Sequence, residues 1–187
     1  MLLSSTFAQK MVRYSTFPRT VAPPDFLESV ISVFKKHEAD ISTEKRAKGL
    51  TSDQVLSVLH DNLVDLGFDM ESGKKRDDKV HRPVFYGENG AATVKYEIDG
   101  FNPTWGCAME IEAGRSWMGN AVYRDIVHAL VMVDVEHLLL AVPISYKFKS
   151  SGRDVVSRDY ENTVNLADAL FSHSRITFPY QHTVIGY

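Results

Sequence analysis

Four carboxylates alternate with apolar side chains in two neighbouring segments of the sequence, residues 93–101 and 107–113. Alternation with a period of two is typical of a β-strand that turns one face toward a core. The sequence NPTWG at 102–106 separates the two segments and predicts a turn. We therefore expect a β-hairpin that carries these acidic side chains on one face: Glu97, Asp99, Glu110 and Glu112.

The register of this hairpin decides what the carboxylates can do. If the turn is centred on residues 104–105, Asp99 faces Glu110 across the hairpin, and Glu97 faces Glu112. Like charges in opposite positions destabilise a strand pair. A divalent cation would remove the conflict, and Mg²⁺ takes one or two protein carboxylates together with water and substrate phosphate. The spacing thus indicates a metal site, although outward-facing acids on an alternating strand also occur without any function.

Helices are expected on both sides of the hairpin. Apolar residues at helical spacing predict helices over 26–37 and 53–66, and Gly67 follows the second as a stop. We expect Ser116 to cap a helix that runs to about Val133, and an apolar strand at 138–146 to follow it. The order predicts an α/β fold, a mixed β-sheet flanked by helices in the order αβββαβ. The remaining expectations are a short strand at 68–72, a charged loop at 73–79, a basic loop at 147–153, a helix at 158–171 and β-like composition at 175–187.

Three motifs in this order resemble the PD-(D/E)XK phosphodiesterases, the restriction endonuclease-like superfamily. They are EID at 97–99, EIE at 110–112 and the apolar strand HLLLAVP at 137–143, with a helix between the last two. The resemblance covers roughly residues 51–146. Two positions depart from the family pattern, because Ile98 replaces a loosely kept Pro and Glu112 stands where the family usually has Lys.

The resemblance implies an endonuclease that uses Mg²⁺, or Mn²⁺, to hydrolyse phosphodiester bonds in DNA. It further implies a restriction or defence role and a homodimer with one active site per strand. By position, Asp99 and Glu110 would bind the metal with help from the backbone carbonyl of Ile111. Glu112 would orient or deprotonate the attacking water. Alternatively, a displaced lysine would do so, with Lys95 nearest in the hairpin, or the protein would be an inactive member.

Polar side chains outside the hairpin are candidates for contacts to nucleic acid. Asn120, Arg124 and His128 are four residues apart and share one helix face. The resemblance places this helix near the phosphate backbone, where Arg124 could bind a phosphate in bidentate fashion. Basic residues also cluster in the predicted charged loop: Lys74, Lys75 and Arg76. Loops of this kind contact phosphates, and solvated surface charges have the same pattern.

The superfamily often adds an acid or a glutamine from the helix that precedes its first core strand. In this sequence the helix expected over 53–66 offers several such side chains, and its apolar stripe does not choose among them: Asp53, Gln54, His60 and Asp61. Asp53 is also an ordinary first-turn helix residue, because a negative charge there complements the helix dipole.

Composition limits the classes of protein that fit. The chain has 187 residues, 44% hydrophobic and 24% charged, which excludes a disordered or collagen-like chain. Its one cysteine, Cys107, excludes an intramolecular disulfide and a cysteine-based zinc site and fits a reducing compartment. A net charge of −3 neither indicates nor excludes a nucleic-acid partner, because a carboxylate cluster offsets basic patches.

The first 24 residues differ from the rest, since no acidic residue precedes Asp25. This composition suits a transit peptide or a basic arm. We expect residues 1–24 to form an N-terminal arm or extension and residues 25–187 a single nuclease-like domain. No apolar run is long enough to span a bilayer, and we expect a cytoplasmic protein.

Two other function classes stay open. A catalytically inactive nuclease-fold protein that binds nucleic acid or a protein partner is the first, and the missing motif lysine favours it. A glycosidase with a carboxylate pair is the second. It ranks last, because the chain is short and has two tryptophans to form a sugar platform, Trp105 and Trp117.

Overall fold

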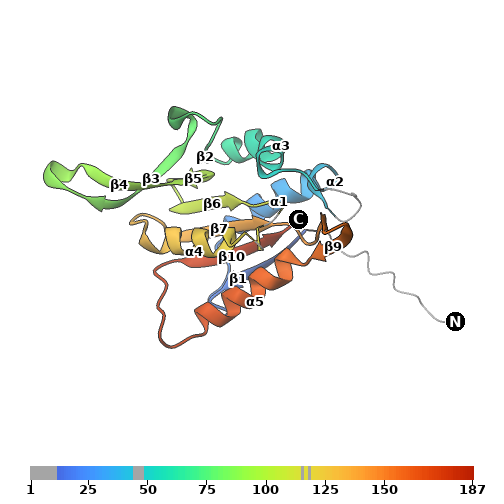
Figure 1. Ribbon diagram of the computed structural model, residues 1–187. Helices are drawn as coiled ribbons and strands as arrows, with labels where there is room; N and C mark the ends of the chain where they lie inside the picture. Colours follow the sequence, from blue (N-terminus) through green and yellow to red (C-terminus); the bar gives the residue numbers. More distant parts are fainter. Residues whose placement is uncertain (1–11, 44–48, 115, 118) are drawn as a thin grey trace.

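The computed structural model describes residues 12–43, 49–114, 116–117 and 119–187. Its centre is a six-stranded mixed sheet with the strand order β1-β10-β7-β6-β5-β2 (Figure 1). Strands β6, β7 and β10 run parallel, and the outer strands are antiparallel to their neighbours. The strands of this sheet are β1 (Arg13–Phe17), β2 (Asp69–Met70), β5 (Gly100–Asn102), β6 (Cys107–Ile111), β7 (His137–Val142) and β10 (Gln181–Gly186).

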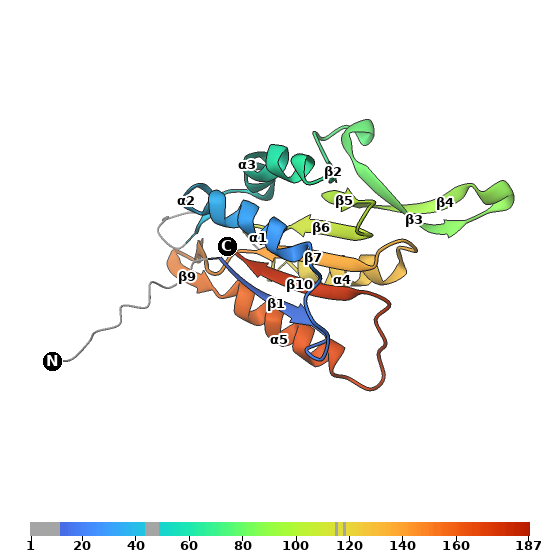
Figure 2. The same ribbon diagram turned by 180° about the vertical axis from the view of Figure 1, so that it is seen from behind.

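Helices cover both faces of the sheet, as Figures 1 and 2 show. One face packs against α1 (Leu27–Lys36) and α3 (Ser52–Asp65), and the short α2 (Glu38–Ile41) adds Ile41 to the same core. The other face packs against α4 (Ala121–Val131) and α5 (Asp159–Phe171). Because both faces are buried, β7 is apolar at almost every position, as central strands of such sheets are. This arrangement confirms the mixed sheet flanked by helices.

A two-stranded arm projects from this body. It consists of β3 (Val80–Tyr86) and β4 (Ala92–Ile98), joined by a tip that includes the short helical turn η2 (Glu88–Gly90) (Figure 2). A second hairpin follows β7 and consists of β8 (Tyr146–Ser150) and β9 (Arg153–Ser157). Within the described part of the chain, none of the helices combines the length and the apolar character needed to cross a bilayer.

Local signals explain why several elements begin and end where they do. Thr51 and Gln54 form a reciprocal capping box at the start of α3, and Gly67 follows its end with a φ of 89°. In the turn before β6, the Asn102 side-chain oxygen accepts hydrogen bonds from the amides of Thr104 and Trp105. The turn therefore sets the register by which Gly100 pairs with Met109, which is the predicted register.

Three sequence-based expectations were wrong. The strand expected over 93–101 is divided at Asp99. The part before Asp99 is β4, which pairs with β3, and only the part after it, β5, pairs with β6. Ser116 does not cap the following helix: its hydroxyl donates to Asp159 at 2.6 Å, and α4 begins after Asn120. The expected basic loop at 147–153 is the β8–β9 hairpin, whose Ser151 and Gly152 both adopt positive φ angles, as a tight hairpin turn requires.

The segment expected to be an arm or an extension has two parts. Residues 1–11 lie outside the described residues. Residues Arg13–Phe17 form the edge strand β1, which pairs with β10 over its full length. Arg19, which follows this strand, forms an ion pair with Asp168 of α5 at 2.9 Å.

A histidine is buried in the sheet beside this edge. His182 of β10 is fully buried, donates from Nδ1 to the carbonyl of Leu138 at 3.2 Å and stacks on Phe171. Burial lowers the pKa of His182 from 6.5 to about 4, because the charged ring would lose its hydration.

This burial predicts a pH dependence of stability. The unfolded chain binds a proton at His182 below pH 6.5 and the folded chain does so only near pH 4, so stability is lost as the pH falls between these values. We expect protonation of His182 to lower the free energy of unfolding by about 3 kcal/mol over this pH range. Denaturant unfolding from pH 7.5 to 4 should show a flatter profile for His182→Gln, which keeps an N–H donor but does not titrate. Parallel profiles for the variant and the wild type would contradict this assignment.

Candidate active site

Asp99 stands at the point where the arm leaves the main sheet. Its Oδ2 accepts a hydrogen bond from the amide of Ile111 in β6 at 2.7 Å. The bond joins the two strands at the place where their ladder ends, and it brings the Asp99 carboxylate beside Glu110. Burial raises the pKa of Asp99 to about 7, although the bond from Ile111 opposes the shift.

Glu110 is a second carboxylate of this group, and it is buried. It is the penultimate residue of β6 and is 7% exposed. Burial raises its pKa well above the usual value, and the neighbouring charges of Asp99, Asp125 and Glu112 act in the same direction. A carboxylate in such surroundings is costly unless a cation neutralises it.

Glu112 and Asp125 share one arginine. Arg124 of α4 contacts a Glu112 oxygen with one guanidinium nitrogen at 2.9 Å and Asp125 with another at 2.9 Å. Asp125 is buried at 1% exposure, and its Oδ2 has no hydrogen-bond partner within the described chain. Burial raises the pKa of Glu112 to about 8, with a further contribution from Asp125.

A cavity of about 440 Å³ lies between the base of the arm and α4. Asp99 and Glu110 line it together with Arg124 and His128, whose ring stacks on Tyr96 at 4.3 Å. The other lining residues come from the arm and from the segment before it: Glu71, Lys79, Lys95, Glu97 and Ile98. The cavity therefore offers buried carboxylates and several cationic side chains to one ligand.

The donors at this site fit a hard divalent cation. Within the residues that the structure describes, no three His, Cys, Asp or Glu side chains are arranged to hold a metal by themselves. Mg²⁺ needs only one or two carboxylates, since water and substrate phosphate complete its shell. The Glu112 amide donates a hydrogen bond to the carbonyl of Ala141 in β7. Backbone groups of successive residues in a strand point to opposite edges, so the amide and carbonyl of Ile111 point away from β7, toward Asp99. The Asp99 carboxylate and the Ile111 carbonyl thus lie at the same edge of β6, and Glu110 lines the same cavity as Asp99.

Three other predicted residues lie outside the carboxylate pair. Glu97 lines the cavity but does not face Glu112. Its side chain is 61% exposed on the arm, 3.6 Å from His81, because β4 has left the main sheet at this point. Asn120 is exposed at the start of α4. Lys95 is exposed on β4 but lines the cavity.

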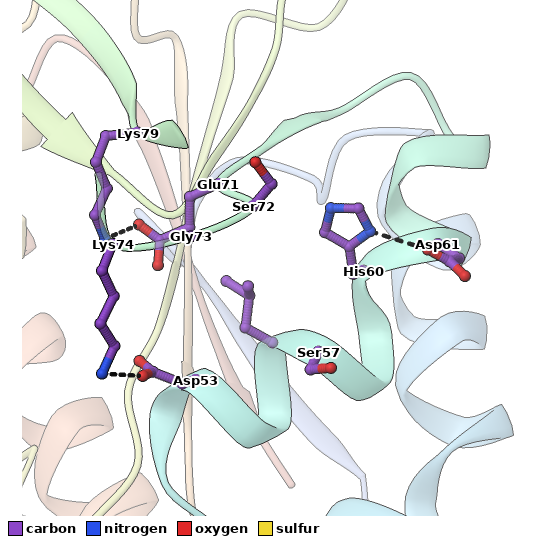
Figure 3. A pocket seen from close by; sticks show the side chains of 10 residues that line it. Asp53, Ser57, His60, Asp61, Glu71, Ser72, Gly73, Lys74 and Lys79 are labelled. Atoms are coloured by element: carbon purple, nitrogen blue, oxygen red, sulfur yellow. Dashed lines mark hydrogen bonds and ion pairs between the residues drawn. The ribbon is translucent and has the colours of Figure 1, made fainter. Parts of the chain in front are cut away.

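The candidates from α3 border a second cavity of about 620 Å³, between α3 and residues 71–79 (Figure 3). Asp53, His60 and Asp61 line this cavity, and the Gln54 side chain instead serves the capping box. The basic residues of the loop are exposed near this cavity: Lys74, Lys75 and Arg76. The Lys74 ammonium lies 3.3 Å from a carboxylate oxygen of Asp53. Glu71 and Lys79 line both cavities, so the two adjoin.

Sequence reasoning missed three charged residues near the carboxylates. Asp125 faces inward on α4, as its spacing to Val122 and Ala129 could have shown. Glu71 and Lys79 flank a charged loop and carry no local signal, because the fold of residues 71–79 alone brings them to the site.

Comparison with known proteins supports the fold. No family model and no curated protein matches this chain. Among solved structures, restriction endonuclease BglII in complex with a DNA 16-mer is similar, with a TM-score of 0.50 and 11% sequence identity. The similarity covers 94% of this chain and 75% of that one. The chain therefore has a restriction-endonuclease-like fold, and at this identity the likeness concerns the fold alone.

The raised pKa values predict that the carboxylates destabilise the protein at alkaline pH. The folded state holds protons on these carboxylates that the unfolded state releases near pH 4.5. The free energy of unfolding therefore falls as the pH rises to about 8. We expect Glu110→Gln to raise the free energy of unfolding at pH 9 by about 1 kcal/mol or more. Denaturant unfolding in EDTA measures this, with Glu97→Gln as the exposed control. A less stable Glu110→Gln protein would show that the charged carboxylate stabilises the fold.

Proposed function

We propose that this protein is a Mg²⁺-dependent endonuclease that hydrolyses phosphodiester bonds in DNA. The observation that supports this most is that the half-buried Asp99 and the buried Glu110 both line a cavity that Arg124 lines as well. The restriction-endonuclease-like fold adds support, since the similar BglII structure was obtained with DNA. A restriction or defence role belongs to the same proposal.

The metal ligands in this proposal are Asp99, Glu110 and the backbone carbonyl of Ile111. Mn²⁺ would replace Mg²⁺ at the same donors, because both prefer oxygen ligands. When bound, the cation would lower the pKa of its water and offset the negative charge that develops on the phosphoryl group.

Glu112 acts as the general base in this proposal. Its carboxylate is 17% exposed, and its pKa of about 8 suits a group that accepts a proton near neutral pH. The water oxygen bonds to phosphorus while the bond from phosphorus to the leaving sugar oxygen breaks. The water proton passes to Glu112, and the leaving oxygen takes a proton from solvent.

Several cations and polar groups would bind the DNA backbone. The guanidinium of Arg124 is 55% exposed and reaches the cavity, so it can pair with a phosphate oxygen as well as with Glu112. Lys95 lines the outer part of the cavity. Asn120 and the loop basic residues would contact phosphates farther along the duplex: Lys74, Lys75 and Arg76. A homodimer would place one such site on each strand.

Cleavage of supercoiled and linear DNA tests the proposal. The wild type should cut with Mg²⁺ or Mn²⁺ and not with EDTA. Glu110→Ala should lower the rate by about 10³-fold or more, because it removes a metal ligand and its charge. Glu161→Ala, at an exposed position of α5 that lines neither cavity, serves as the matched control and should stay near the wild-type rate. Absence of cutting by the wild type on a broad set of sequences favours the inactive nucleic-acid-binding alternative.

Metal binding can be tested without cleavage. A cation between Asp99 and Glu110 removes their repulsion, so Mg²⁺ should raise the melting temperature of the wild type. The rise should be absent in Asp99→Asn and in Glu110→Gln and retained in Glu97→Gln. Differential scanning calorimetry at pH 8 measures this, and an equal rise in all four proteins would place the cation elsewhere.

A further inference from the structure

A lysine from outside the acidic hairpin borders the candidate site. Lys79 lies between the short helix η1 (Arg76–Asp78) and β3, at the foot of the arm. Its Nζ is 2.5 Å from Oε2 of Glu71, and Figure 3 shows this ion pair at the edge of the second cavity. The Lys79 side chain is 22% exposed and that of Glu71 14%, so solvent screens this pair less than the surface pairs of the molecule.

The Lys79 ammonium is close enough to act on the buried carboxylates. Although burial raises the pKa of Asp99, the charge of Lys79 lowers it. In turn, the hydrogen bond that Lys79 donates to Glu71 and the charges of Glu97 and Asp99 raise the pKa of Lys79. Lys79 therefore stays protonated and contributes a positive charge at the carboxylate end of the cavity.

The position of Lys79 leaves it accessible to a ligand. Lys79 and Glu71 line both the site cavity and the cavity beside α3, so the pair separates two open spaces. A phosphate that enters the site cavity can therefore meet a side chain that lines it.

Lys95, the other lysine at this cavity, is held differently. It lies on β4 opposite Pro83, with an exposed side chain. An exposed ammonium must give up hydration and side-chain freedom when it meets a phosphate. Lys79 has already given up much of its hydration and side-chain freedom in the ion pair with Glu71. A charge that is held in place in this way stabilises a developing negative charge most effectively.

We propose that Lys79 is a catalytic residue of the phosphodiester hydrolysis, donating a hydrogen bond to a non-bridging oxygen of the phosphate that lies between Asp99 and Arg124. Glu71 is then a positioning residue that holds the ammonium in place. The assignment rests on the proposed nuclease function and extends it. As water attacks, negative charge grows on the non-bridging oxygens, and the Lys79 ammonium offsets it.

Single-turnover cleavage of a DNA substrate that the wild type cuts tests this assignment. We expect Lys79→Met to lower the rate constant by about 10²–10³-fold. Lys79→Arg keeps the charge and should recover at least tenfold of that loss. Lys35→Met is the matched control, because it removes a lysine that is paired with Glu28 on α1 and lines neither cavity, and it should stay within about threefold of the wild type. Glu71→Gln should fall between Lys79→Met and the wild type, because the ammonium remains but is less firmly held.

Binding of the same DNA in Ca²⁺ separates catalysis from affinity and from folding. The dissociation constant of Lys79→Met should change far less than its rate constant, which a merely structural defect would not produce. If Lys79→Met is unstable because Glu71 is left unpaired, the double variant Lys79→Met with Glu71→Gln removes that charge and should show the same slow cleavage.

Three outcomes would overturn the assignment. Wild-type rates in both Lys79→Met and the double variant would remove Lys79 from the reaction and leave the nuclease proposal standing. A slow Lys95→Met beside a normal Lys79→Met would transfer the role to Lys95. A wild type that cuts no DNA with any metal would refute the nuclease proposal, and the assignment would fall with it.

Discussion

The hydrogen bond from the Ile111 amide to the Asp99 carboxylate is the contact on which the site depends. A backbone amide at the end of a ladder needs an acceptor, and here a side chain supplies it where the neighbouring strand turns away. The chain can therefore leave the main sheet at Asp99 and form the arm with β3. The same bond brings a carboxylate beside Glu110, so the end of the ladder and the centre of the site coincide.

The cluster around this bond carries more negative charge than its own cations balance. Asp99, Glu110, Glu112 and Asp125 are all drawn out of water, and burial raises the pKa of each. Arg124 forms ion pairs with two of them, Glu112 and Asp125, and its side chain is partly exposed to solvent. A fold selected for stability alone would place apolar side chains here. Retained repulsion of this kind is typical of sites that bind a cation or stabilise charge during a reaction.

Helix α4 joins the core of the protein to this site. Its inner face, with Val122 and Ile126, packs against the sheet, while Arg124 and His128 turn toward the cavity. The helix also connects β6 to the parallel strand β7, so the carboxylates lie near the carboxyl end of β6, where open α/β sheets commonly bind ligands. The core packing that positions α4 therefore also positions the guanidinium relative to the carboxylates.

The sequence by itself determined what depends on neighbours in the chain. The helical spacing of α1, α3 and α5, the stop at Gly67 and the turn that sets the register of β5 on β6 all follow from residues a few positions apart. The roles of Asp99, Glu110 and Glu112 stay predictions from that pattern. Only the tertiary structure separated Glu97 from Glu112 and brought Asp125, Glu71 and Lys79 near the carboxylates. Strand pairing and helix orientation decide these contacts, and both depend on how distant segments bury their apolar faces together, which no local pattern records.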